Sequence, residues 1–94
     1  MNELAKNDAV LADSVRASAV EFLRVELRIA NTMLDLAAAT SEAESYARRR
    51  AQAQEAYSTA KRYLNEPAVP LHAEDVRVIA AGLRELEERI TTAP

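Results

Sequence analysis

From residue 1 to residue 66 the chain contains neither glycine nor proline, and prolines then follow at Pro67 and Pro70. Proline lacks a backbone N–H group and its ring clashes with the preceding helical turn, so a helix has to end before Pro67. The single glycine is Gly82, and the good helix formers Ala, Leu, Glu and Arg are abundant. No stretch alternates polar and apolar residues for long enough to form a strand. The sequence therefore predicts helices and no sheet.

The chain is predicted to form one domain, 1–94, with helices at about residues 8–39, 42–65 and 73–90 and short disordered tails. The first two helices are not one rod, because at about 100° per residue the apolar seam of the second would continue from the polar side of the first. Ser41 and Glu44 have the spacing of a capping box, which predicts a helix start after the turn. These features favour an all-α, up-down-up antiparallel bundle of three helices.

The first predicted helix carries two apolar stripes. One contains Leu11, Val15, Phe22, Val25, Ile29, Met33 and Leu36, with Ser18 as its polar member. The other lies about 140° around the helix and contains Val20, Leu23, Leu27, Ala30 and Leu34. A helix with one neighbour needs an apolar stripe only a little over ~100° wide, so this helix is expected to have neighbours on two sides. The other two helices can supply them, and a second copy of the chain is the alternative.

The second and third predicted helices each carry one narrow seam. The seam of the second consists of Tyr46, Arg50, Ala53, Tyr57, Ala60 and Leu64. The seam of the third consists of Val76, Ile79, Leu83, Leu86 and Ile90. Alternating spacings of three and four residues suit antiparallel packing, and the alanines allow the helices to approach closely.

The first predicted helix is also longer than the second, at ~48 Å against ~36 Å. In an antiparallel hairpin its first turns therefore overhang, and exposed apolar residues there favour association into a twofold dimer. The candidate interface residues are Val10, Leu11, Val15 and Leu23.

Basic side chains are frequent on the second predicted helix. Arg50 falls on the seam, and we expect it to reach a carboxylate of a neighbouring helix or to extend past the seam to solvent. The others form a candidate basic patch that could bind an acidic partner or nucleic acid: Arg48, Arg49, Lys61 and Arg62. The favoured alternative is a solvated face balanced within the chain, because the net charge of −3 disfavours a general nucleic-acid binder.

No reaction chemistry is identifiable, so we predict no enzyme, no cofactor and no metal site. The absence of cysteine excludes disulfides and thiolate chemistry and fits a cytoplasmic location. His72 is the single histidine, which cannot form a metal site alone, and Gly82 alone cannot form a glycine-rich phosphate loop. No signal peptide is visible, and no apolar stretch approaches the ~20 residues that span a bilayer, so no membrane contact is predicted.

Residues 53–60, AQEAYSTA, place Ala53, Tyr57 and Ala60 at the A-x3-[FY]-x2-A spacing. This spacing resembles the second helix of a tetratricopeptide repeat. The larger order of FLRxxxxIA, AxxAYxTAxxxL and PLxxED segments is similar to small uncharacterised bacterial proteins of about this length. The resemblance implies a closely packed helical hairpin, and stacked repeats of that family bind protein segments.

The predicted function is that of a non-enzymatic, cytoplasmic interaction or scaffold protein that forms a homodimer. A further protein partner is an open alternative, and the sequence does not identify one. The alternative is a regulatory binder of an acidic partner or nucleic acid through the basic face of residues 42–65.

Overall fold

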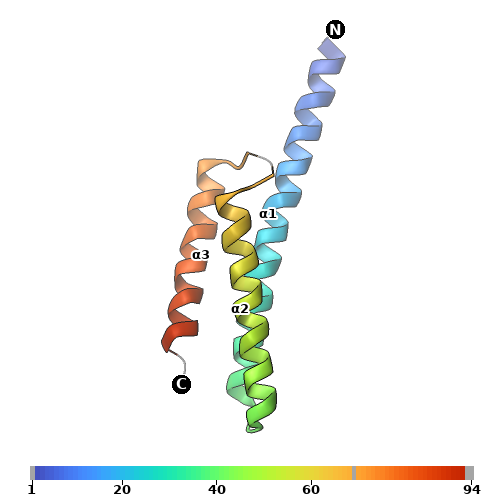
Figure 1. The fold of residues 1–94 in the computed structure, drawn as a ribbon. Coiled ribbons are helices and arrows are strands. Elements are labelled where there is room, and N and C mark those ends of the chain that lie inside the picture. Colours follow the sequence, from blue (N-terminus) through green and yellow to red (C-terminus); the bar gives the residue numbers. More distant parts are fainter. Residues whose placement is uncertain (1, 69, 93–94) are drawn as a thin grey trace.

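The computed structural model describes residues 2–68 and 70–92, with side chains from residue 9 onward. Over these residues the protein is an all-α bundle of three helices, α1 (Asn2–Ala39), α2 (Ala43–Asn65) and α3 (Ala73–Thr92). Successive helices run in opposite directions, as Figure 1 shows. The molecule is elongated, with extents of 63 × 19 × 17 Å. The predicted all-α bundle is therefore confirmed.

Two helices extend further than predicted. α1 begins at Asn2 instead of near residue 8, and α3 ends at Thr92 instead of near residue 90. No proline or glycine opposes the additional turns of α1. In the last turn of α3 the hydroxyl of Thr92 donates to the carbonyl of Glu88 at 2.6 Å, which satisfies a helix-end acceptor. Residues 2–7 and 91–92 were expected to be tails and are helical instead, and residues 1, 93 and 94 lie outside the described residues.

A turn at Thr40–Glu42 separates α1 from α2, as predicted. The hydroxyl of Thr40 accepts a hydrogen bond from the N–H of Glu42 at 3.3 Å. The predicted capping box of Ser41 and Glu44 is wrong, because Glu42 occupies the N-cap position and its side chain makes no cap hydrogen bond. A threonine side chain can bond to neighbouring backbone as well as a serine can, and here the threonine stabilises the turn.

The core lies between one side of α1 and the facing sides of α2 and α3. Its buried members are Leu23, Ala30, Leu34, Ala53, Ala56, Tyr57, Ala60, Ile79, Leu83 and Leu86. Small alanine side chains let the axes of α1 and α2 come close together, and α1 makes its most extensive contact with α2. The predicted seams of α2 and α3 are confirmed at these buried positions.

The N-terminal part of α1 projects beyond the loop between α2 and α3 (Figure 1). In this part Val10 and Leu11 are 65% and 62% exposed. The predicted overhang is therefore confirmed. It has a simple origin, because α1 spans 38 residues and α2 only 23.

Candidate interaction surface

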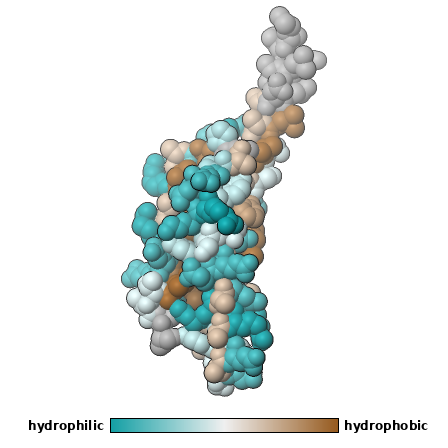
Figure 2. Space-filling view, in the orientation of Figure 1, coloured by the Kyte–Doolittle hydropathy of each residue, from teal (hydrophilic) through white to brown (hydrophobic). Residues whose placement is uncertain are grey.

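A row of large apolar side chains lies on the surface of α1. We call it the α1 stripe, and its members, 38–62% exposed, are Leu11, Val15, Phe22, Ile29 and Leu36. Figure 2 shows hydrophobic surface along the edge of the molecule that α1 forms. Single exposed apolar residues are common, but an aligned row of them makes this face of α1 a candidate site of contact with another molecule.

The phase of α1 explains why the stripe is exposed. At about 100° per residue the stripe lies about 120° around the helix from the buried Leu23, Ala30 and Leu34. Both α2 and α3 pack on that buried side, so the expectation that they cover both stripes is wrong. α2 reaches only the edge of the exposed stripe, where the ring centroids of Phe22 and Tyr63 are 5.1 Å apart.

The four predicted interface residues separate into two groups. Val10, Leu11 and Val15 are exposed, so their side chains are accessible to a partner. Leu23 is 0% exposed and belongs to the core, so its assignment to an interface is wrong. The physical reason is its place on the core-facing stripe, in phase with Ala30 and Leu34.

A groove runs beside the α1 stripe, between α1 and α2. Its volume is about 350 Å³. α1 contributes Phe22, Glu26, Ile29 and Met33 to its lining, and α2 contributes Gln52, Glu55, Ala56 and Thr59. One wall is thus largely apolar and the other largely polar.

The predicted basic residues are distributed around α2: Arg48, Arg49, Lys61 and Arg62. The Nη1 atom of Arg49 lies 3.8 Å from the sulfur of Met33, on the side of α1. The Nζ atom of Lys61 lies 5.7 Å from the ring centroid of Tyr57 and lines a hollow against α3. Because these two side chains flank opposite sides of α2, the structure does not gather the four residues into one face.

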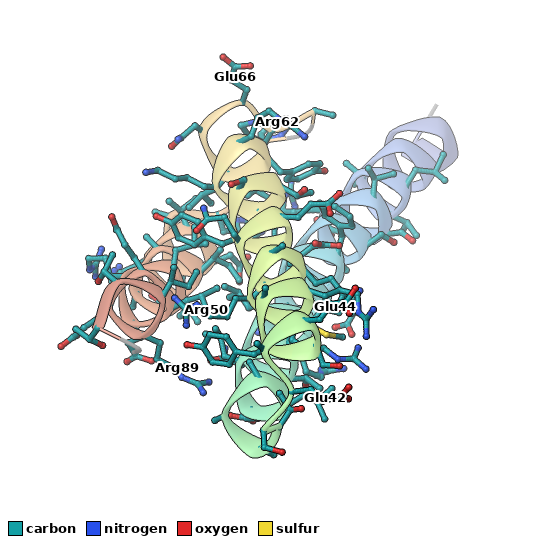
Figure 3. All side chains as sticks on the ribbon, turned by 60° about the horizontal axis from the view of Figure 1, so that its bottom comes forward. Glu42, Glu44, Arg50, Arg62, Glu66 and Arg89 are labelled. Atoms are coloured by element: carbon teal, nitrogen blue, oxygen red, sulfur yellow. The ribbon has the colours of Figure 1, made fainter. Side chains whose placement is uncertain are left out.

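Arg50 connects α2 to α3. Its Nη2 atom donates a hydrogen bond to the carbonyl of Ile90, and its guanidinium lies 5.7 Å from the ring centroid of Tyr46. The expectation of a carboxylate partner on α3 is wrong, because a carbonyl near the helix end serves as the acceptor. Carbonyls at a helix C-terminus lack helical partners and carry partial negative charge. Figure 3 shows Arg50 on the side of α2 that faces α3, and Arg89 on α3 itself.

Replacing Tyr46 by Phe is expected to stabilise the protein. The hydroxyl oxygen of Tyr46 is buried without a hydrogen-bond partner among the described residues. Such a group costs about 1–3 kcal/mol, so Tyr46→Phe is expected to raise the free energy of unfolding by about 1 kcal/mol. Chemical denaturation followed by circular dichroism measures this, with Tyr63→Phe as the matched control. If Tyr46→Phe but not Tyr63→Phe lowers the stability, the hydroxyl of Tyr46 has a hydrogen-bond partner and the prediction is wrong.

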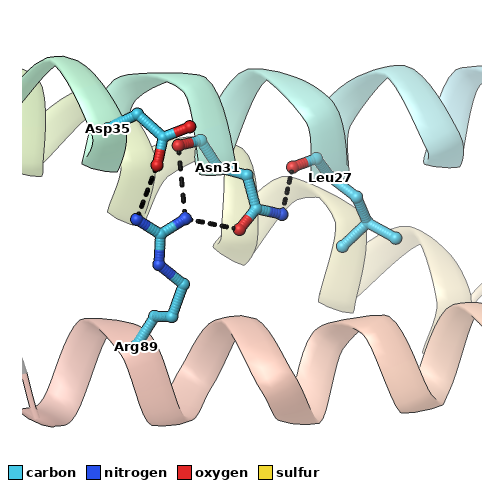
Figure 4. A network of polar contacts seen from close by, with 4 residues as sticks. All are labelled: Leu27, Asn31, Asp35 and Arg89. Carbon is cyan, nitrogen blue, oxygen red and sulfur yellow. Dashed lines mark hydrogen bonds and ion pairs between the residues drawn. The ribbon is translucent and has the colours of Figure 1, made fainter.

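Arg89 connects α3 to α1 through a network that the sequence did not indicate (Figure 4). Its Nη1 atom donates to Oδ1 of Asn31 and its Nη2 atom to Oδ1 of Asp35, both at 2.8 Å. The amide of Asn31 in turn donates to the carbonyl of Leu27 at 3.0 Å. The spacing of Asn31 and Asp35, one turn apart on α1, is the signal that could have indicated a shared partner.

Arg16 holds the loop between α2 and α3 against α1. Its Nε atom donates to the carbonyl of Pro70 at 3.1 Å, and its Nη1 atom lies 2.7 Å from Oδ1 of Asp13 and 3.2 Å from Nε2 of His72. His72 thus lies in the loop directly before α3. These residues border an open hollow of about 560 Å³. Their contacts are all within the chain, and their role is to anchor the loop.

These features define a small three-helix, all-α protein with an exposed apolar stripe on its longest helix. Within the described part of the chain, no three His, Asp or Glu side chains cluster in a way that could hold a metal ion. None of the described helices combines the length and the apolar character needed to cross a membrane. Comparisons with protein-family models, curated proteins and solved structures found no match for this chain.

Proposed function

We propose that this is a non-enzymatic interaction or scaffold protein that forms a homodimer through the α1 stripe. One observation carries the proposal, namely that large apolar side chains remain 38–62% exposed along one face of α1 from Leu11 to Leu36. Removing apolar surface from water contributes roughly 25 cal/mol per Å². Covering this row with a second protein therefore supplies the driving force for association.

The position of the stripe also supports the proposal. Helices α2 and α3 already pack on another side of α1, about 120° around the helix, where Leu23 and Leu34 are buried. The core therefore forms without the stripe, and a chain that folds alone still presents it. A surface of this kind can bind a partner without unfolding of the bundle.

The resemblance to a tetratricopeptide hairpin concerns packing. Ala53, Tyr57 and Ala60 are buried, and close packing is the role that the resemblance implies for them. A concave peptide-binding groove needs stacked repeats, so we propose no such groove from one hairpin. The similarity to small bacterial proteins and the cytoplasmic location stay predictions.

The alternative function, binding of an acidic partner or nucleic acid through α2, has less support. Its residues do not share a face of α2, and Arg49 and Lys61 contact side chains of this chain. Salt-dependent binding that is lost on charge reversal at Arg48 and Arg62, with folding retained, would favour it.

Replacing both Leu11 and Val15 by Glu is expected to weaken the dimer at least about tenfold, because two charges per chain enter an apolar interface. Both side chains are exposed and lie outside the core cluster, so helicity should be retained. Light scattering coupled to size-exclusion chromatography measures the association at tens of micromolar protein, and circular dichroism measures the helicity.

Val78→Glu is the matched control for this experiment. Val78 is 52% exposed but lies on α3, so the same change there is expected to leave the dimer intact. Equal weakening by Val78→Glu would show that general surface hydrophobicity drives association. A wild-type protein that is strictly monomeric at this concentration would contradict homodimer formation.

A further inference from the structure

We propose that the two copies pair through the α1 stripe in antiparallel orientation. The twofold axis that relates them is perpendicular to α1 and lies level with the midpoint between Leu23 and Arg24. This inference rests on the proposed function and adds the partner, the direction and the register. It follows from the spacing, size and charge of residues on the exposed side of α1.

The exposed side of α1 follows a seven-residue repeat. Spacings of four and three residues alternate through Leu11, Val15, Ser18, Phe22, Val25, Ile29, Thr32 and Leu36. This is the a/d pattern of helices that pair lengthwise. Its positions are exposed or partly exposed in the single chain, because α2 and α3 pack on the other side. The repeat is therefore accessible to a helix from another chain.

Side-chain size favours the antiparallel direction. With the axis at this point, each layer joins residues from opposite ends of the repeat: Leu11 with Leu36, Val15 with Thr32, Ser18 with Ile29, and Phe22 with Val25 of the second copy. In the Ser18–Ile29 and Phe22–Val25 layers a small side chain then faces a larger one, and the other two layers pair side chains of equal size, so all four are filled evenly. In parallel pairing each residue meets its own copy, so Ser18 leaves a void and Phe22 crowds another Phe22.

Charge favours the same direction. Glu21 and Arg28 flank the repeat on the side away from α2; both are exposed, and neither forms an ion pair among the described residues. The antiparallel register places Glu21 beside Arg28 of the second copy, and symmetry repeats this pair. Parallel pairing instead places Glu21 beside Glu26 of the second copy, which is repulsive. Charges at these flanking positions determine the orientation of paired helices.

The register also matches the length of α1. Leu11 of one copy meets Leu36 of the other, close to the end of α1 at Ala39. The overhang of each chain therefore covers the C-terminal part of the other chain's α1. Leu11 and Val15, which the chain's own α2 and α3 leave exposed, become buried in the pair.

A charge-exchange experiment tests the register. Glu21→Arg alone and Arg28→Glu alone are each expected to weaken the dimer about tenfold, because each places like charges together twice. The double variant is expected to restore the wild-type dissociation constant to within about threefold. The two residues lie roughly 10 Å apart along one helix, so the rescue arises between chains. Sedimentation equilibrium measures the constants, and Arg84→Glu on the exposed face of α3 is the control.

Disulfide formation tests the direction, and the natural chain has no cysteine to interfere. A mixture of Ser18→Cys and Ile29→Cys chains is expected to form the mixed disulfide on oxidation, because these positions face each other. Ser18→Cys alone is expected to form none within the dimer, because the two copies of residue 18 would be roughly 16 Å apart. Mass spectrometry identifies the products.

The outcomes separate this inference from the proposed function. A dimer that Leu11→Glu/Val15→Glu disrupts, but in which Ser18→Cys pairs with itself or the charge exchange fails to rescue, overturns the antiparallel register and leaves the homodimer intact. A chain that is monomeric in every form overturns both. Mixed disulfides together with charge rescue support both.

Discussion

Replacing Leu23 by Ala is expected to lower the free energy of unfolding by about 3 kcal/mol. Leu23 is 0% exposed and is one of the largest fully buried side chains of the protein. Its shortening leaves a cavity among helices that already pack closely through small side chains such as Ala30, Ala53 and Ala60, so the surroundings can collapse little. The total free energy of unfolding of a small domain is about 5–15 kcal/mol, so this loss is a large share of the stability. Urea denaturation followed by circular dichroism measures it.

Leu11→Ala is the matched control, because it makes the same change on the same helix. Leu11 is 62% exposed, so at a protein concentration where the chain is monomeric its shortening is expected to change the free energy of unfolding by less than about 0.5 kcal/mol. Equal losses in the two variants would contradict the assignment of Leu23 to the core and of Leu11 to the surface.

Replacing Ala53 by Leu is expected to lower the free energy of unfolding by about 2 kcal/mol, through overpacking. Ala53 is 0% exposed in the core cluster that α1 and α2 share. Leucine is nearly as good a helix former as alanine, so the loss would arise from crowding between helices and not from α2 itself. Thermal and urea denaturation measure it.

Ala51→Leu is the control for this overpacking, because Ala51 is exposed on the same helix. Its effect is expected to stay within about 0.5 kcal/mol. If Ala53→Leu is as stable as the wild type, α1 and α2 are not as close at this point as the structure shows.

Part of the candidate interaction surface is predictable from the sequence. The sequence predicts that Val10, Leu11 and Val15 overhang, because the first helix is longer than the second. Ile29 and Leu36 were recognised as apolar but not as surface. The signal that could have distinguished them is the seven-residue repeat, because it is sustained at positions that the core does not use.

Several side-chain partners were not predictable. Arg50 binds the carbonyl of Ile90, and Arg89 reaches Asn31 and Asp35 on α1. Long arginine side chains have many acceptors within reach, and the choice among them depends on how the helix ends are placed. Helical spacing alone indicates only neighbours on the same helix.

The sequence by itself determined the number of helices, the break before Pro67 and the two apolar stripes of α1, because these depend on backbone chemistry and on the spacing of neighbours. Only the tertiary structure decided which stripe is buried. Leu11 and Leu23 are both leucines on α1. Their exposures of 62% and 0% differ because α2 and α3 both pack against the side of α1 that carries Leu23. That choice depends on the fit of side chains from distant segments, such as Ala53 and Ala60 against α1, which local spacing does not contain.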